Sequence, residues 1–232
     1  MSEANRGAIL AALGAGLGRV PSPGLKAEIE ARIDRPRRNL EPKRANLGPA
    51  GQRDLLLAKL GALAVSVDRV APDQVAAAVA AWIARHNLPA EAVLAPDPAL
   101  DECGWERTAL SLRRGRAQDR DQVSVVPGFA AVAETGTLML LSGAERPTTL
   151  NFMPDNHVVV LRASDVVGTL EDAFEKLRRA RKAAGRDDLP RTVNLISGPS
   201  RTADVDQTIV MGAHGPRRLH VVLIEDRPDG GA

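Results

Sequence analysis

The chain has 232 residues, a formal net charge of +2, 44% hydrophobic residues and 2% aromatic residues, so it lacks the aromatic faces that stack on single-stranded nucleic acid. Its one cysteine, Cys103, excludes an internal disulfide and cannot hold an iron–sulfur cluster by itself. No apolar run is long enough to span a membrane and no secretory signal opens the chain, so we expect a soluble cytoplasmic protein with no nucleic-acid partner.

Residues 1–50 are predicted to form a helical N-terminal extension followed by a basic linker. Four aliphatic side chains between Ile9 and Leu17 share one helical face, although three nearby glycines each weaken a helix by up to about 1 kcal/mol. Residues 35–44 then combine two prolines with five basic residues. Such a run is typical of a solvated linker or of a basic arm for an acidic partner, and base rates favour the linker. We expect this extension to lie on the rim of the protein or to pack against a partner.

Residues 51–226 are predicted to form one α/β domain with a mostly parallel sheet. Apolar positions recur at Val75, Val79, Trp82 and Ile83, which is the spacing of a helix that packs on a sheet. A strand before this helix and another after it make a βαβ crossover, and such crossovers join parallel strands. In chain order we expect a helix over residues 54–63, a strand at 64–70, the helix from residue 72 and a strand at 92–95.

The second half of the domain continues this alternation. Two short apolar runs within residues 123–141 fit buried strands. Thr169 and Asp172 have the capping-box spacing that predicts the start of a helix. The stretch 98–122 resists assignment, with Trp105 expected in the core. The remaining predictions are strands at 158–161, 193–196 and 219–224, a helix after Asp204 with Val205 and Ile209 inward, and a disordered tail at 227–232.

Glu134 is the first candidate for a reactive group. It begins the sequence Glu134-Thr-Gly-Thr137 between the two apolar runs, where a carboxylate and two hydroxyls are costly to bury unless they are hydrogen-bonded. A base or a nucleophile needs the tightly held geometry that burial at a strand end supplies. Alternatively, the carboxylate accepts backbone N–H bonds and braces the turn. The residues alone do not choose between these two roles.

The loop Ser197-Gly-Pro-Ser-Arg-Thr-Ala-Asp204 is the most specific local signal in the chain. A helix is expected directly after it, so free backbone N–H groups and the helix dipole would attract an anion there. Arg201 can hold a carboxylate or a phosphate with two hydrogen bonds, beside the hydroxyl groups of the loop. In the alternative, Ser200 or Thr202 merely caps the helix and Asp204 favours its first turn. Ligand binding is the preferred interpretation, because an arginine does not help to cap that end of a helix.

His214 is the best candidate for a proton carrier among the four histidines. It lies between two glycines shortly after the expected helix, within reach of the same pocket. His157, at the start of a predicted strand, is a second candidate, whereas His86 and His220 are expected to be bystanders. No pair of His or Cys has metal-ligand spacing and no glycine-rich phosphate-binding motif occurs, so we expect no metal, nucleotide or dinucleotide.

Four segments of the chain resemble the LUD-domain family, and specifically its lactate-utilisation protein C (LutC/YkgG) subfamily. They come in the order of the family, and the similarity covers roughly residues 50–226, whereas the first 50 residues match little. The segments are Ala133-Glu-Thr-Gly-Thr-Leu138, Met153-Pro-Asp-Asn-His157, Ile196-Ser-Gly-Pro-Ser-Arg-Thr-Ala-Asp204 and Gly212-Ala-His-Gly-Pro216.

The resemblance implies a three-layer α/β/α fold like that of the NagB/RpiA/CoA-transferase group. It also implies that the chain supports the oxidation of L-lactate to pyruvate together with iron–sulfur partner proteins, the A and B components, while itself binding no cofactor. From the chemistry of the residues, and not from the resemblance, Glu134 and His214 are the candidates for catalysis, and a small carboxylate would bind to other residues of the matched segments. These expected ligand-binding residues are Thr135, Gly136, Thr137, Pro154, His157, Ser197, Gly198, Ser200, Arg201, Thr202, Asp204, Gly212 and Gly215.

Two other functions stay open. The related fold group includes CoA transferases with a glutamate nucleophile, so Glu134 would serve acyl transfer in an independent enzyme, although a shared fold is weak evidence for shared chemistry. The basic side chains within residues 176–182 suggest a nucleic-acid-binding module, but they lack interleaved aromatic residues. In the preferred hypothesis, the loops of Glu134 and Arg201 meet over the ends of one sheet and form a single pocket for an anion.

Overall fold

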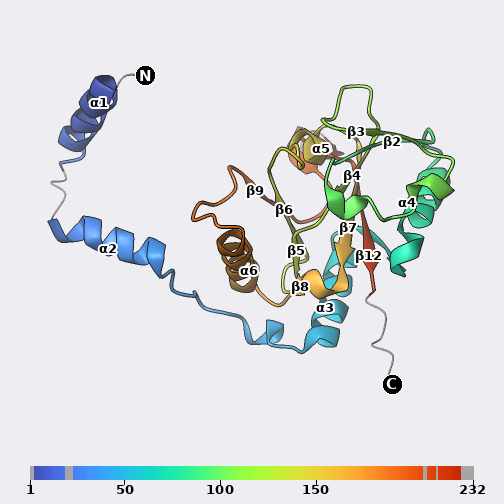
Figure 1. The fold of residues 1–232 in the computed structure, drawn as a ribbon, viewed down its shortest axis with the longest axis horizontal. Helices are drawn as coiled ribbons and strands as arrows, with labels where there is room; N and C mark the ends of the chain where they lie inside the picture. Colours follow the sequence, from blue (N-terminus) through green and yellow to red (C-terminus); the bar gives the residue numbers. More distant parts are fainter. Residues whose placement is uncertain (1–2, 19–22, 206–207, 213, 226–232) are drawn as a thin grey trace. The chain divides into compact units, whose positions relative to one another are not determined.

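The chain divides into two compact units, residues 1–40 and residues 41–232. The first unit holds two helices, α1 (Glu3–Gly16) and α2 (Pro23–Asp34) (Figure 1). The buried apolar side chains run from Ala45 to Ile224, so the core that the structure describes belongs to the second unit. The computed structural model describes residues 3–18, 23–205, 208–212 and 214–225.

The second unit is built on a six-stranded sheet in which every neighbouring pair of strands is parallel. The strand order is β1-β12-β7-β4-β2-β3, and the central strands are rich in valine and leucine because both faces of the sheet are covered. The strands are β1 (Ser66–Val70), β2 (Glu91–Leu94), β3 (Ser111–Arg114), β4 (Val123–Pro127), β7 (Asn156–Arg162) and β12 (Arg218–Ile224). The predicted α/β class with a mostly parallel sheet is confirmed.

A second, four-stranded sheet lies between the main sheet and helix α6. Its order is β8-β5-β6-β9, and β6 pairs antiparallel with both of its neighbours. This sheet is a layer that the sequence did not reveal, because the apolar pattern shows that strands exist but not which of them pair. The elements are β5 (Ala130–Val132), β6 (Thr137–Leu141), β8 (Val166–Val167), α6 (Leu170–Ala183) and β9 (Val193–Ile196).

Alternating side chains give the second sheet two buried faces. Ala131 and Leu138 join the core of the main sheet, whereas Ala130 and Met139 pack with Leu177 of α6. Successive residues of a strand point to opposite faces, so one short hairpin contributes side chains to both hydrophobic clusters. Figure 1 shows the result as layers, with α4 and α6 on opposite sides of the main sheet.

Three further helices cover the remaining surfaces. The apolar stripe of Val75, Val79, Trp82 and Ile83 is buried on α4, which packs on the sheet as predicted, and α4 contacts β1 and β12. Helix α3 contacts both β1 and β8 and so joins the two sheets, while α5 contacts β4 and β7. No helix in the described ranges is both long and apolar enough to cross a membrane. These helices are α3 (Pro49–Ala62), α4 (Val75–Arg85) and α5 (Thr149–Phe152).

A strand hairpin stands where the last helix was expected. Strands β10 (Arg201–Val205) and β11 (Thr208–Met211) pair antiparallel, so the predicted helix after Asp204 is wrong. Val205 and Ile209 have helical spacing, but the segment is rich in threonine, valine and isoleucine, whose branched β-carbons favour strands. The loop before β10 therefore has no following helix N-terminus to attract an anion.

Candidate functional site

A hollow of about 260 Å³ lies at the amino ends of β7 and β12. Helix α5, the loop after β9 and the turn before β12 form the rest of its wall. Arg201 is the one Lys or Arg among its described lining residues, and none of these is Asp or Glu, so the hollow favours an anion. The polar and aromatic lining residues that matter below are Phe152, His157, Ser197, Ser200, Arg201 and His214.

His157 lines this hollow and is fully buried. Its neighbour is Ser124, because the two residues are partners in the register of β4 and β7. Ser124 Oγ donates to the Leu150 carbonyl at 2.6 Å and lies 3.0 Å from His157 Nδ1. The serine has only one hydroxyl proton and gives it to the carbonyl, so Nδ1–H must donate to the serine. The other ring nitrogen, Nε2, is then unprotonated, and burial lowers the pKa of His157 to about 4.

Main-chain bonds join the loop after β9 to the turn before β12. The Ser200 N–H donates to the Pro216 carbonyl at 2.8 Å, and the Gly212 N–H donates to the Ser200 carbonyl at 3.0 Å. The His214 N–H donates to Ser200 Oγ at 3.3 Å. These bonds place Ser200 and His214 in the wall of one hollow.

Arg201 connects the hollow to the end of α3. Its Nη2 donates at 2.7 Å to the carbonyl of Leu63, the residue that caps this helix. The last carbonyls of a helix have no partner within the helix, and an arginine is well suited to satisfy them. Arg201 therefore does help to cap a helix, but at the C-terminus of α3. The guanidinium has five N–H donors in a rigid fork, so this bond orients it beside the hollow and leaves it able to hold an anion.

The two predicted loops meet at one end of the second sheet. Thr137 Oγ1 lies 2.7 Å from Ser197 Oγ and 2.7 Å from Thr135 Oγ1. The register of β6 and β9 pairs Leu138 with Ile196, which brings these hydroxyl groups side by side. The loops thus touch through a chain of hydroxyl groups.

The same two loops press glycines against the end of α3. Gly136 has φ +70°, and a β-carbon there would lie 2.9 Å from Lys59 Cβ. Gly198 has φ +100°, and its β-carbon would lie 3.1 Å from the Leu63 carbonyl oxygen. Only glycine combines this backbone conformation with so close an approach. The end of α3 is therefore the platform that aligns both loops.

Glu134 contacts the first turn of α6. Its Oε1 accepts the Leu170 N–H at 3.4 Å, and its own N–H donates to the Gly168 carbonyl at 3.1 Å. A carboxylate at the first turn of a helix is stabilised by the helix dipole. Glu134 does not line the hollow, so the expected pocket shared by Glu134 and Arg201 does not form, and the geometry matches the bracing alternative. A catalytic role for Glu134 stays a prediction.

The other expected site residues fall into three groups. Gly198 and Gly215 line the hollow, together with the residues already described. The hollow is not lined by residues 135–137, by Gly212 or by the buried Pro154. The side chains of Thr202 and Asp204 lie outside the described part of the structure.

Ser124 and Phe152 were missed by the sequence analysis. Ser124 interrupts a valine run in β4, and only the strand register reveals that it sits beside His157. Phe152 is 46% exposed and lines the hollow from the end of α5, a helix that the sequence analysis did not predict. A polar residue inside an apolar strand was the one available signal for the first, since a buried hydroxyl needs a partner.

Neither a metal cluster nor a reactive thiol is evident in the described ranges. No group of three or more His, Cys, Asp or Glu there could hold a metal ion. Cys103 is buried, and burial raises the pKa of its thiol, which disfavours the reactive thiolate.

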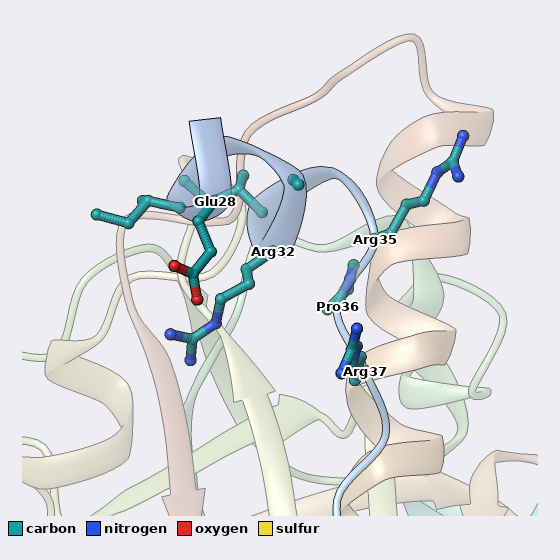
Figure 2. Close-up of a pocket in the computed structure, with 8 residues that line it drawn as sticks. Glu28, Arg32, Arg35, Pro36 and Arg37 are labelled. Carbon is teal, nitrogen blue, oxygen red and sulfur yellow. The ribbon is translucent and has the colours of Figure 1, made fainter. Parts of the chain in front are cut away.

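A larger hollow, of about 890 Å³, lies along the C-terminal half of α2 and the residues directly after it. All of its lining residues come from the single stretch 28–37. Figure 2 shows that the side chains of Glu28 and Arg32 extend to one side of the helix, whereas Arg35 extends away from them. A hollow formed by one exposed stretch does not converge polar groups on a ligand, so we assign no site to it.

Comparison with known proteins identifies the part of the chain that carries the smaller hollow. The family model of the LUD domain matches residues 123–224, a range that includes every residue lining this hollow. This region is a LUD domain. The resemblance to the LutC/YkgG subfamily is confirmed by similar proteins that carry those names.

The chain spans about half the length of the curated bacterial proteins that it matches. Lactate utilization protein C of Halalkalibacterium halodurans is 29% identical over 143 residues, which are 56% of this chain and 61% of that protein. Uncharacterized protein YkgG of Escherichia coli is 35% identical over 108 residues, covering 47% of this chain and 46% of that protein. Lactate utilization protein C of Geobacillus thermodenitrificans is 30% identical, covering 55% of both chains.

A solved structure shares the fold. The crystal structure of a DUF162 family protein from Deinococcus radiodurans matches with a TM-score of 0.57 and 23% sequence identity. The match covers 77% of this chain and 99% of that chain. At this identity the likeness concerns the fold alone, and it agrees with the parallel sheet and flanking helices described above.

Proposed function

We propose that this chain is the cluster-free component of a lactate utilisation system and supports the oxidation of L-lactate to pyruvate together with iron–sulfur partner proteins. The observation that carries the proposal is the similarity to several proteins named Lactate utilization protein C. The single cysteine supports the division of labour, because one thiol cannot hold an iron–sulfur cluster. The clusters would then belong to the partners.

The chemistry of the hollow supports a small carboxylate as the bound ligand. Arg201 supplies a positive, forked donor, and the described lining contains no carboxylate that would repel an anion. Ser197 and Ser200 add hydroxyl groups that can donate to a bound oxygen. Lactate and pyruvate are both small carboxylates, so either can use this set of donors.

Deletion of the gene in the source organism tests the proposal. We expect the deletion strain to grow normally on glucose and to fail on L-lactate as sole carbon source, and the wild-type gene to restore growth. The Arg201→Gln variant should restore growth poorly, whereas Arg179→Gln should restore it fully, because Arg179 lies on the exposed outer side of α6. Normal growth of the deletion strain on L-lactate would contradict the proposed function.

A purification experiment tests the partners. The tagged chain, expressed from its own gene in cells grown on L-lactate, should retain cysteine-rich proteins that show the absorbance of iron–sulfur clusters. Recovery of the chain without any cluster-containing protein, under conditions in which the cells oxidise lactate, would contradict the role assigned to partners.

A further inference from the structure

His157 lines the hollow and carries an unsatisfied ring nitrogen. The ring is 0% exposed, and its Nε2 has no hydrogen-bond partner among the residues that the structure describes. Buried polar atoms in proteins are nearly always hydrogen-bonded. An unpaired nitrogen on a residue that lines a hollow therefore points to a group that completes the bond when the hollow is filled.

The hydrogen bonds of Ser124 determine whether this missing group is a donor or an acceptor. Because its hydroxyl donates to the Leu150 carbonyl, it accepts from His157 Nδ1–H, and Nε2 is left with a lone pair. The missing partner must therefore be a hydrogen-bond donor. A carboxylate offers only acceptors, so it cannot be the group that meets Nε2.

Arg201 requires a hydrogen-bond acceptor in the same hollow. Its guanidinium is anchored to Leu63 and lines the hollow, where it can donate to a carboxylate. A ligand that satisfies both residues needs a negative acceptor and a neutral donor close together, within about 260 Å³. A small 2-hydroxy carboxylate carries these groups on adjacent carbons. Phe152 and Leu195 add an apolar wall for a short aliphatic substituent.

A second serine–histidine pair in the same sheet provides a contrast. Ser66 Oγ lies 2.8 Å from His220 Nδ1, and His220 is also fully buried. Its Nε2 also has no hydrogen-bond partner among the described residues, but it lies 3.6 Å from Asp68 Oδ2, and its ring stacks on Trp82 with the ring centres 5.0 Å apart. His220 does not line the hollow. The chain thus contains a second buried histidine with a serine at its Nδ1, and this histidine does not line the hollow.

We propose that His157 Nε2 accepts a hydrogen bond from the hydroxyl group of a small 2-hydroxy carboxylate whose carboxylate is held by Arg201. This bond makes the hollow prefer hydroxy acids to keto acids and to unsubstituted acids. A keto acid such as pyruvate would set a carbonyl lone pair against the lone pair of Nε2, and propionate would leave Nε2 unpaired. The inference rests on the proposed function for the location of the site, and it adds the substrate class and the residue that determines specificity.

Nitrogen NMR of the histidine rings tests this without any substitution. The full chain, labelled with ¹⁵N-histidine and held near pH 7, is titrated with L-lactate, glycolate, pyruvate and propionate. We expect L-lactate or glycolate to shift the Nε2 resonance of His157 and to leave His220 unchanged, and propionate to leave both unchanged. The hydroxy acid should bind about five-fold more tightly than propionate, the strength of one added hydrogen bond.

A pair of variants measures the same preference by calorimetry. His157→Asn keeps a side-chain N–H near the position of Nδ1 and removes Nε2, and His220→Asn is the matched control. Circular dichroism and thermal unfolding establish that both variants fold. His157→Asn should lose the roughly five-fold preference for the hydroxy acid while it keeps its affinity for propionate, whereas His220→Asn should keep the preference. If His157→Asn does not fold, the NMR titration of the wild-type chain decides alone.

The outcomes separate this inference from the proposed function. Suppose that glycolate shifts the Nε2 resonance of His157, while L-lactate does not bind and the deletion strain grows normally on L-lactate. This result would support the inference, and the lactate function would fail. Binding of L-lactate without any change at His157 Nε2, or an unchanged preference in a folded His157→Asn variant, would overturn the inference and leave the lactate function standing. An unchanged His157 resonance with every hydroxy acid would also overturn it.

Discussion

At the scale of single residues, register rather than sequence proximity creates the two serine–histidine pairs. Ser124 is the register partner of His157, and Ser66 is the register partner of His220. Both histidines are buried and neutral near pH 7, since burial lowers the pKa of each to about 4. The two histidines differ in their surroundings, because His157 lines the hollow whereas His220 Nε2 lies 3.6 Å from Asp68 Oδ2.

Buried neutral histidines make the stability of the fold depend on pH. His157 takes up its proton near pH 4 when folded and near pH 6.5 when unfolded, so below pH 6.5 the unfolded chain binds more protons. Stability is therefore full above pH 6.5 and falls with decreasing pH, and the contribution of His157 at pH 4 is a loss of about 3 kcal/mol.

Urea unfolding at several pH values, for wild-type and His157→Asn chains, measures this contribution. Carboxyl groups also titrate in this range, but they are common to both chains, so the difference between the chains isolates the histidine. We expect the stability of the variant to fall less steeply between pH 6.5 and pH 4. Parallel curves for the two chains would show that His157 does not titrate as described.

At the scale of elements, the sequence predicted well what depends on local chemistry. The capping box of Thr169 and Asp172 forms, with Asp172 N–H donating to Thr169 Oγ1 at 3.2 Å, and α6 begins there. The apolar stripe of α4 is buried as expected. The hairpin after Arg201 was missed because two apolar residues at helical spacing outweighed the β-branched composition of the segment. The position of Glu134 beside the first turn of α6 could not be predicted from the sequence, because packing between distant segments determines it.

The hairpin turn at Gly136 gives a prediction at this scale. Gly136→Ala should lower the free energy of unfolding by about 3 kcal/mol, since it combines a left-handed backbone with a β-carbon pressed on Lys59. Gly143→Ala is the matched control, because Gly143 is exposed and a β-carbon added there would have no other atom within 4 Å. Chemical denaturation of both variants measures the effect. Equal stability of the two variants would contradict the role of α3 as the platform for the loops.

At the scale of the whole molecule, the described core and the hollow both belong to the second unit. Every buried apolar side chain of the described residues lies between Ala45 and Ile224, and the hollow is lined by residues 151–219. In the first unit, Leu10, Leu13 and Ile33 are all more than half exposed. Sequence periodicity predicted the helices of this unit but carries no information on what covers their apolar side chains.

Removal of residues 1–40 should therefore leave the second unit folded. We expect the thermal unfolding midpoint of the truncated chain to change by less than about 4 °C, the shift that roughly 1 kcal/mol produces in a domain of this size. Its affinity for hydroxy acids should equal that of the full chain. A much lower midpoint or lost cooperativity would show that the first unit contributes to the core.

The central claim is that the hollow at the amino ends of β7 and β12 holds a small carboxylate between Arg201 and His157. A crystal structure of the full chain grown with saturating L-lactate tests it most directly. We expect density for lactate in this hollow, with its carboxylate at the Arg201 guanidinium and its hydroxyl within hydrogen-bond distance of His157 Nε2. Lactate bound at another place on the chain, with the hollow filled by water alone, would contradict it.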